Sequence, residues 1–368
     1  MDHKKIRAIG AGVLAALWIV LTGFAWFAPV KEISETERRR LDQMPKIKFE
    51  SILEGKFMGD FEDFTLDQFP LRDGFRQIKS LFHYNVLNQS DNNDIYVADG
   101  HIVKQEYPLN QQSLDHAAER FNALYEKYLK DSGGRVFLTV VPDKGYYLAQ
   151  ANGYLAMDYS SMFTQLQQAL PWAEYIDITG TLEAEDYYRT DTHWRQEKLL
   201  ETAQRLCQSM GITAFTEEEM TVTAIDRPFY GVYYGQSALP VESETMYILE
   251  NELLSQCKVY VYEDQKYADV YDMTKLQSLD LYDVYLSGAK SVLTIENPNA
   301  TTDKELIVFR DSFGSSMVPL LVKDYAKVTL VDIRYIHMGW LGQYLKFNGQ
   351  DVLLLYSTMV LNNSSTIQ

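Results

Sequence analysis

An aspartate and a histidine stand two positions apart, at Asp191 and His193, within residues 187–194. On a loop that enters a helix, this spacing lets the carboxylate accept the imidazole Nδ1 proton, so that Nε2 faces outward as a base. The pattern is weak on its own, because an aspartate that caps a helix beside a surface histidine gives the same spacing. It gains weight only if the chain also supplies a nucleophile.

A serine occupies a position that suits a nucleophile. The apolar run at residues 306–309 predicts a buried strand, which ends at Asp311 and Ser312 before a helical segment. A serine at such a turn presents its hydroxyl at the carboxyl edge of a sheet, where helix N–H groups can stabilise an oxyanion. Simple capping of the helix is the structural alternative. Because both patterns occur in one chain, we predict that Ser312 forms a catalytic triad with His193 and Asp191.

These motifs resemble those of known families. Asp311-Ser312-Phe313 is similar to the serine motif of SGNH hydrolases, and Asp191-Thr192-His193-Trp194 resembles the signature of the alginate O-acetylation proteins and the related DHHW protein family. Residues 67–70, Arg72-Asp73 and residues 141–144 also resemble DHHW-family segments. The resemblance therefore covers nearly the whole chain after the N-terminal apolar segment.

The resemblance implies a three-layer α/β domain of the SGNH-hydrolase type. In SGNH enzymes the serine motif comes first, whereas Ser312 lies about 120 residues after His193. This implies a circularly permuted motif order, as in the alginate proteins, and a triad is defined by geometry rather than by order. The implied activity is ping-pong acyl transfer, in which Ser312 takes an acetyl group and passes it to a sugar hydroxyl.

Two positions depart from the family patterns. Arg310 stands where the SGNH motif has glycine, which disfavours a turn with positive φ and could crowd or bind the substrate. Thr192 stands where the DHHW name implies histidine. Because Thr192 lies between two triad members, we expect its side chain to point away from them.

The residues that would complete an oxyanion hole are less clear. SGNH enzymes use a glycine and an asparagine from later motifs, and Asn362 could take the asparagine's role, although a surface turn fits it equally well. Lys144 and Arg310 could stabilise negative charge near the serine, and an ion-paired or solvated surface position is their ordinary alternative. Cys207 and Cys257 show neither redox nor zinc spacing, so no cofactor and no metal is predicted; separate buried cysteines are favoured slightly over a disulfide.

The composition limits the partners. The 368 residues carry a formal net charge of −17 without a basic patch, which argues against nucleic acid. With 46% hydrophobic residues the chain can bury a full core. Its 26 tyrosines and five tryptophans suit stacking on sugars, but ordinary packing explains them as well.

The N-terminus predicts a membrane anchor. Basic residues at positions 4, 5 and 7 precede an uncharged apolar run at residues 8–30, which is long enough as a helix to cross a bilayer. No clear cleavage site precedes Pro29, so we favour an uncleaved signal anchor with the rest of the chain on the extracytoplasmic side. Basic residues also follow the span, and charge alone leaves the orientation open.

The remaining pattern predicts three regions. Residues 1–30 form a cytoplasmic tip and anchor, residues 31–90 a juxtamembrane linker with helices interrupted at Pro70, and residues 91–368 the α/β domain with a mixed β insertion at about 213–299. A hairpin is expected at residues 95–103 and helices at 113–130 and 195–210. Buried parallel strands are expected at residues 136–141, 175–178, 306–309, 328–331 and 352–356.

Together these features predict an extracytoplasmic O-acetyltransferase-like enzyme. By resemblance, the acceptor is an exported cell-surface polysaccharide, and a multi-pass membrane acyltransferase hands over the acyl group. A carbohydrate esterase with the same triad is one alternative, because water and a sugar hydroxyl compete for the same acyl-enzyme. A non-catalytic glycan-binding or scaffold protein of a polysaccharide modification system is another, and Arg310 with the unclear later motifs makes it plausible.

Overall fold

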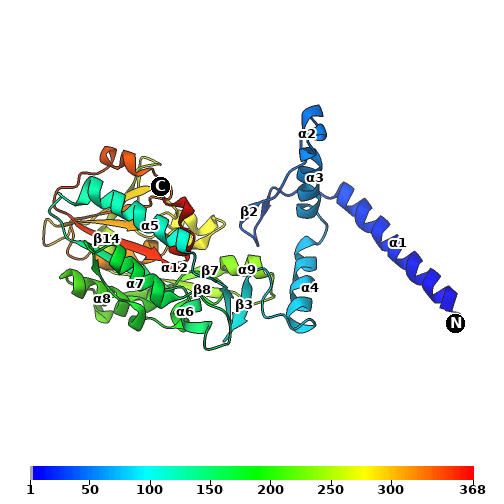
Figure 1. Cartoon of the computed structure of the whole chain (residues 1–368), viewed down its shortest axis with the longest axis horizontal. Coiled ribbons are helices and arrows are strands. Elements are labelled where there is room, and N and C mark those ends of the chain that lie inside the picture. Colours follow the sequence, from blue (N-terminus) through cyan, green and yellow to red (C-terminus); the bar gives the residue numbers. More distant parts are fainter. Residues whose placement is uncertain (1–2) are drawn as a thin grey trace. The chain divides into compact units, whose positions relative to one another are not determined.

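A computed structural model describes residues 3–368 (Figure 1). The chain divides into two compact units. One contains the residues up to Asn92 together with Tyr234–Pro240, and the other contains Asn93–Tyr233 and Val241–Gln368.

The first unit begins with helix α1, His3–Phe27. Within the described residues, His3–Ala25 is the one helical segment long and apolar enough to cross a membrane. The unit also contains strands β1 (Ile33–Ser34) and β2 (Arg39–Arg40) and helices α2 (Phe49–Leu53), α3 (Lys56–Asp67) and α4 (Arg72–Asn85). The predicted helical stretch is interrupted around Pro70, because proline removes a backbone donor. A hydrogen bond from Arg39 lowers the pKa of Asp67 to about 2 and ties the β1–β2 hairpin to the end of α3.

The second unit is built on one eight-stranded sheet, in the order β10-β9-β11-β13-β12-β14-β5-β6. The strands from β13 to β6 run parallel, and β11, β9 and β10 extend this sheet antiparallel. Their bounds are β10 Lys266–Ala268, β9 Lys258–Val261, β11 Val292–Glu296, β13 Lys327–Val331, β12 Glu305–Arg310, β14 Asp351–Ser357, β5 Val136–Val141 and β6 Glu174–Tyr175.

The sheet buries both of its faces. Successive side chains alternate between the faces, so Ile307 and Leu354 belong to one apolar cluster while Val308 and Leu355 belong to the other. Helices α5 (Gln111–Leu124) and α7 (Tyr159–Ala169) contribute to the first cluster, and α8 (Leu200–Met210) and α11 (Gly314–Met317) to the second. Burial on both faces explains why these strands are nearly continuous apolar runs. The predicted α/β class, with a large sheet and helices packed against it, is thus confirmed.

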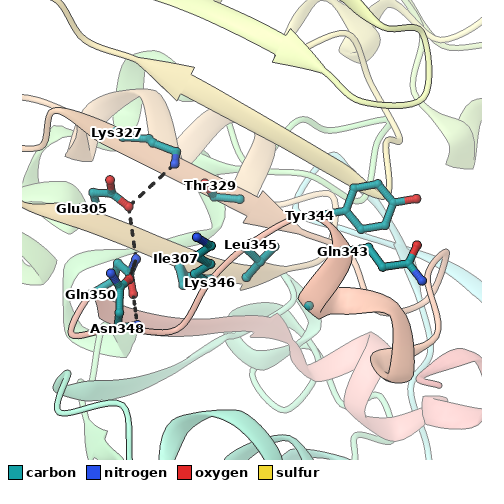
Figure 2. A pocket seen from close by; sticks show the side chains of 11 residues that line it. Glu305, Ile307, Lys327, Thr329, Gln343, Tyr344, Leu345, Lys346, Asn348 and Gln350 are labelled. Carbon is teal, nitrogen blue, oxygen red and sulfur yellow. Dashed lines mark hydrogen bonds and ion pairs between the residues drawn. The ribbon is translucent and has the colours of Figure 1, made fainter.

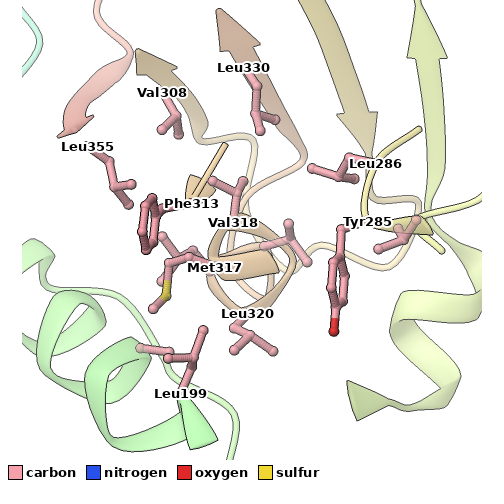
Figure 3. Packing of buried hydrophobic residues seen from close by; sticks show 14 of the residues in the cluster. Leu199, Tyr285, Leu286, Val308, Phe313, Met317, Val318, Leu320, Leu330 and Leu355 are labelled. Carbon is pink, nitrogen blue, oxygen red and sulfur yellow. The ribbon is translucent and has the colours of Figure 1, made fainter. Parts of the chain in front are cut away.

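The segment after β12 is held by this packing. Figure 3 shows Phe313 and Met317 packed with Leu199 and Leu355 in one buried cluster. All four side chains are at most 2% exposed. The turn that carries Ser312 therefore rests on a close-packed core, which fixes its position.

The region at residues 213–299 contains five strands, from β7 to β11. Strands β7 (Thr221–Phe229) and β8 (Glu244–Glu250) pair with each other as an antiparallel hairpin, whereas β9, β10 and β11 join the main sheet. The predicted hairpin at residues 95–103 is also present, as β3 (Ile95–Ala98) and β4 (His101–Lys104), with positive φ at Asp99 and Gly100. The remaining helices are α6 (Gly145–Leu148), α9 (Val232–Ser237), α10 (Glu252–Gln256) and α12 (Thr358–Asn362).

Two elements are shorter than predicted. Strand β6 ends at Tyr175, because Asp177 accepts a hydrogen bond from Thr179 N–H at 2.9 Å and turns the chain. The helix expected from residue 195 begins as a single 3₁₀ turn, and regular α-helix starts only at Leu200.

Candidate active site

The parallel strands β5, β12 and β14 end at one edge of the sheet, and Ser312 lies there, two residues after β12. The preceding residue, Asp311, is fully buried. Its Oδ2 accepts a hydrogen bond from Ser357 N–H at 2.7 Å, and its Oδ1 accepts one from Phe313 N–H at 3.0 Å. Asp311 therefore fixes the turn and leaves the half-buried Ser312 hydroxyl free to face other elements.

Three side chains form a continuous hydrogen-bonded chain at this edge. Asp191 Oδ1 lies 2.6 Å from His193 Nδ1, and His193 Nε2 lies 2.8 Å from Ser312 Oγ. Asp191 Oδ1 also accepts the backbone N–H of His193 at 3.0 Å. With Nδ1–H donating to the carboxylate, Nε2 is the acceptor for the serine hydroxyl. This arrangement can take a proton from Ser312 as the oxygen attacks an electrophile.

Lys144 supports the loop that carries the aspartate and the histidine. It follows β5 and is only 2% exposed. Its ammonium group donates hydrogen bonds to the carbonyl oxygens of Tyr188, at 2.9 Å, and Arg189, at 3.1 Å. Burial lowers the pKa of Lys144 to about 7, against the opposing attraction of Asp191 and Glu244. Its observed contacts are therefore with the loop backbone, and a role in stabilising an oxyanion stays a prediction.

The strand-rich segment between residues 213 and 299 makes hydrogen bonds to the same loop. Val232 N–H donates to Asp191 Oδ2 at 2.8 Å, and Gly231 N–H donates to Thr190 Oγ1 at 2.9 Å. A Cβ atom at Gly231 would lie 2.2 Å from Thr190 O, so only glycine permits this approach. Glu244 accepts hydrogen bonds from Thr190 N–H at 2.8 Å and from its hydroxyl at 2.6 Å. Both oxygens of the Asp191 carboxylate are thus occupied and oriented.

Tyr282, from the same segment, packs on the ring of His193. Its ring stacks on His193 with centroids 3.9 Å apart and planes inclined by 12°. Its hydroxyl lies 2.7 Å from Ser316 Oγ, which also accepts the indole N–H of Trp194 at 2.8 Å. Burial raises the pKa of Tyr282, so the phenol stays protonated. Tyr282 was not identified from the sequence, because the sequence around it showed only an irregular, strand-like pattern.

Arg310 is buried beneath the serine turn. Its side chain is 1% exposed, its Nη1 donates to Asp311 O at 3.3 Å, and it lies 4.0 Å from the carboxylate of Asp332. Position 310 continues strand β12 and needs no positive φ. The close approach falls instead at Gly314, where a Cβ atom would lie 2.8 Å from Arg310 Cβ. The oxyanion or substrate role of Arg310 stays a prediction, which these contacts do not favour.

Asn362 is engaged with a neighbouring loop. Its Oδ1 accepts Asn110 N–H at 2.7 Å, and its Nδ2 donates to Glu106 Oε2 and to Pro108 O, both at 3.3 Å. Among the described residues, no hydrogen bond joins it to Ser312. Both ends of the amide are therefore occupied, and its oxyanion role stays a prediction that this geometry does not favour.

The backbone donors expected next to the serine are also partly used. Phe313 N–H donates to the Asp311 carboxylate, and Gly314 N–H donates to Asp311 O at 3.1 Å. Thr192 points away from the aspartate and the histidine, as expected, and its hydroxyl donates to the Met359 sulfur at 3.0 Å.

No candidate metal site accompanies this arrangement. Within residues 3–368, no group of three or more histidine, cysteine or acidic side chains is placed to hold a metal ion. Cys207 and Cys257 are both buried and are not bonded to each other. Burial raises the pKa of Cys207 to about 12 and that of Cys257 to about 11, so both thiols are protonated at neutral pH.

Comparison with known proteins identifies the family resemblance. Residues 159–331 match the family model described as DHHW protein, which confirms the resemblance predicted from the sequence. This range contains Asp191, His193 and Ser312. No curated protein sequence matches the chain.

Two solved structures with TM-scores above 0.5 share the fold at low sequence identity, and a third shows a weaker similarity. A DHHW family protein from Eubacterium siraeum is 21% identical with a TM-score of 0.60, and the match covers 75% of this chain and 95% of that one. Bacillus cereus PatB1 with a sulfonyl adduct is 18% identical with a TM-score of 0.58, covering 74% and 97%. The O-acetyltransferase domain of Pseudomonas putida AlgJ is 12% identical with a TM-score of 0.45, covering 73% and 92%.

Proposed function

We propose that this chain, which matches the DHHW protein family, is a membrane-anchored serine acyltransferase that acetylates a cell-surface polysaccharide outside the cytoplasm. The observation that carries the proposal is the hydrogen-bonded chain from Asp191 through His193 to the half-buried Ser312. A serine, a histidine and a buried carboxylate in this order are the parts that nucleophilic acyl transfer requires. The acetyl group and the sugar acceptor come from the sequence resemblance to the alginate O-acetylation proteins.

In the first half-reaction, Ser312 Oγ attacks the carbonyl carbon of an acetyl ester and its proton passes to His193 Nε2. The tetrahedral intermediate collapses when the bond to the donor oxygen breaks, and His193 returns the proton to that leaving oxygen. Asp191 stays ionised and stabilises the imidazolium. The products are a donor alcohol and acetyl-Ser312.

In the second half-reaction, a sugar hydroxyl gives its proton to His193 and attacks the acetyl carbon. The bond to Ser312 Oγ breaks, and His193 returns the proton to the serine. One ester is made for each ester broken, so no further reactant is needed. The oxyanion of each intermediate requires N–H donors. Because Phe313 and Gly314 N–H pair with Asp311, we assign this role to the N–H of Ser312 itself.

The anchor and the partner complete the proposal. Helix α1 would anchor the catalytic unit to the extracytoplasmic side of the cell membrane, where a multi-pass membrane acyltransferase supplies the acetyl group. The permuted motif order relative to SGNH hydrolases also belongs to this proposal.

Covalent labelling and product analysis test the function. The purified full-length chain in detergent is incubated with 4-nitrophenyl acetate, with and without polysaccharide, and the sugar is analysed for new O-acetyl groups. Phenylmethylsulfonyl fluoride, a sulfonylating reagent, should label Ser312 and abolish turnover. Ser312→Ala should lose both labelling and turnover, while Ser160→Ala, on the exposed face of α7, should keep both. Donor loss without sugar acetylation would indicate an esterase, and no donor loss would indicate a scaffold.

A further inference from the structure

A polar hollow of about 470 Å³ lies between the loop that follows β4 and the end of α12. Glu106, Tyr107 and Asn110 line one side, and Asn362 and Asn363 line the other. Most of the residues that line it carry a carboxylate, an amide or an ammonium group, so it suits a ligand rich in hydroxyl groups rather than an apolar one.

Helix α12 connects this hollow to the candidate active site. The helix begins at the end of β14, where Ser357 N–H donates to the Asp311 carboxylate at 2.7 Å. Asn363 directly follows the helix, and its Nδ2 donates to Met359 O at 3.0 Å. Met359 accepts the hydroxyl of Thr192, the residue between the two triad members. Because Asn362 and Asn363 line the hollow, it begins at the end of this short helix.

A second hollow, of about 350 Å³, is placed differently (Figure 2). Glu305 and Lys327, at the amino ends of β12 and β13, line it together with Gln350, which precedes β14. Ser312 follows the opposite, carboxyl end of β12. The second hollow therefore lies at the opposite end of the strands from Ser312 and cannot present a ligand to it. Its lining residues serve as matched control positions.

The first hollow offers a prepared set of hydrogen-bonding groups. Glu106 is 7% exposed, and its Oε2 accepts Asn362 Nδ2 at 3.3 Å and Asn363 Nδ2 at 3.2 Å. Its other oxygen, Oε1, lies 4.0 Å from Lys104 Nζ, beyond hydrogen-bonding distance. The carboxylate is thus held in place by the two amides with one oxygen left for a ligand hydroxyl. Tyr107, 53% exposed, offers an aromatic face to stack on a sugar ring.

We propose that this hollow is a sugar-binding subsite, built on Glu106, Tyr107, Asn362 and Asn363, that holds the acceptor chain beside Ser312. The carboxylates of Glu106 and of the lining residue Asp94 outnumber the one cation in the lining, Lys104. The whole chain carries a net charge of −17, which adds to the repulsion of anions. The subsite therefore accepts uncharged sugar residues and discriminates against polyuronates. That the bound sugar is the acyl acceptor rests on the proposed function, whereas the binding itself does not.

Ligand-observed NMR titration of the full-length chain tests the subsite. Cellotetraose is the uncharged probe and tetragalacturonate the anionic one. We expect cellotetraose to bind the wild-type and Ser312→Ala chains equally. Tyr107→Ala and Asn363→Ala, both at exposed positions, should raise its Kd roughly tenfold. Tyr344→Ala and Asn348→Ala, at the second hollow, should leave the Kd unchanged.

Charge selectivity gives an independent readout. The wild-type chain should bind tetragalacturonate at least tenfold more weakly than cellotetraose, and Glu106→Gln should narrow that gap. The subsite is overturned if Tyr107→Ala or Asn363→Ala leaves the Kd of cellotetraose unchanged. Tighter binding of tetragalacturonate than of cellotetraose to the wild-type chain, or no binding of cellotetraose to it, overturns the subsite as well. Binding that follows this pattern in a chain without transferase activity keeps the subsite and rejects the proposed function.

Discussion

His193 Nε2 lies 2.8 Å from Ser312 Oγ although 119 positions separate the two residues in the chain. The histidine sits on a loop after β6 and the serine on the turn after β12, and the two meet at the carboxyl edge of the sheet. The buried carboxylate of Asp191 completes the arrangement from the histidine's own loop.

Asp191→Asn tests the orientation of the histidine. The amide cannot accept the Nδ1 proton as a carboxylate does, so the imidazole adopts the wrong tautomer and kcat for 4-nitrophenyl acetate should fall by about 10³- to 10⁴-fold. KM should change little, because the carboxylate does not face the substrate. Asp158→Asn, at the exposed start of α7, is the control. Retention of more than a tenth of the wild-type kcat would contradict the triad.

Gly231→Ala tests the close approach of the strand-rich segment to the loop that carries Asp191 and His193. The added Cβ would lie 2.2 Å from Thr190 O and 2.3 Å from Asp191 Cα, so the two backbones must separate. We expect a loss of about 1–3 kcal/mol in the free energy of unfolding, measured in urea, together with a lower kcat. Gly180→Ala has no heavy atom within 4 Å of the new Cβ and should change neither quantity. Equal effects of the two variants would show that the approach at Gly231 is unimportant.

Tyr282 should position the imidazole through stacking more than through its hydroxyl. Tyr282→Phe keeps the ring over His193 and loses only the contact with Ser316 Oγ, so kcat should fall a few-fold. Tyr282→Leu removes the aromatic face, and a displaced imidazole should reduce kcat by about tenfold to a hundredfold. Steady-state kinetics with unchanged far-UV circular dichroism provides the measurement. A larger loss in the phenylalanine variant than in the leucine variant would reverse the assignment.

Lys144 gives stability a specific dependence on pH. Burial lowers its pKa from 10.5 to about 7, so between these values the unfolded chain binds a proton that the folded chain has released. The free energy of unfolding should therefore increase as the pH rises from about 7 to 10.5. Below that window both states are protonated at Lys144, so this residue should add no dependence on pH. Lys144→Met should lose this rise, as urea titrations at pH 7 and pH 9.5 would reveal. Parallel pH dependences in the two chains would count against a lowered pKa.

Cysteine labelling tests the orientation across the membrane. Because the native Cys207 and Cys257 are buried, a membrane-impermeant maleimide should leave the wild-type chain unlabelled in intact cells. Ser160→Cys, at an exposed position of α7, should be labelled from outside. Lys4→Cys, at the proposed cytoplasmic tip, should react only after permeabilisation. The opposite pattern would place the catalytic unit in the cytoplasm.

The central strands could be predicted from the sequence because each is buried on both faces. Runs such as residues 306–309 and 352–356 are apolar at every position, and their boundaries agree with β12 and β14 within a few residues. The hairpin turn at Asp99 and Gly100 could also be predicted, because its positive φ angles demand particular residue types. Local chemistry was sufficient in each case.

The support of the candidate site could not be predicted in the same way. Gly231, Glu244 and Tyr282 act through contacts with residues 41 to 89 positions away, and no local pattern distinguishes them from other loop residues. Asn362 illustrates the reverse difficulty. Its position after a predicted strand suggested a role beside the serine, whereas its amide is engaged by Asn110, Glu106 and Pro108. The spacing of motifs in the sequence does not predict side-chain partners that are brought together only by tertiary packing.

The contacts that residues 231–282 make with Asp191 and His193 have an evolutionary consequence. This segment supplies no atom to the proposed proton relay, yet it sets the environment of both Asp191 and His193. Two homologues with identical relay residues could therefore differ in turnover through drift in this segment alone. Ranking such homologues by the presence of the three residues would miss the difference, whereas swapping the segment between them would transfer it.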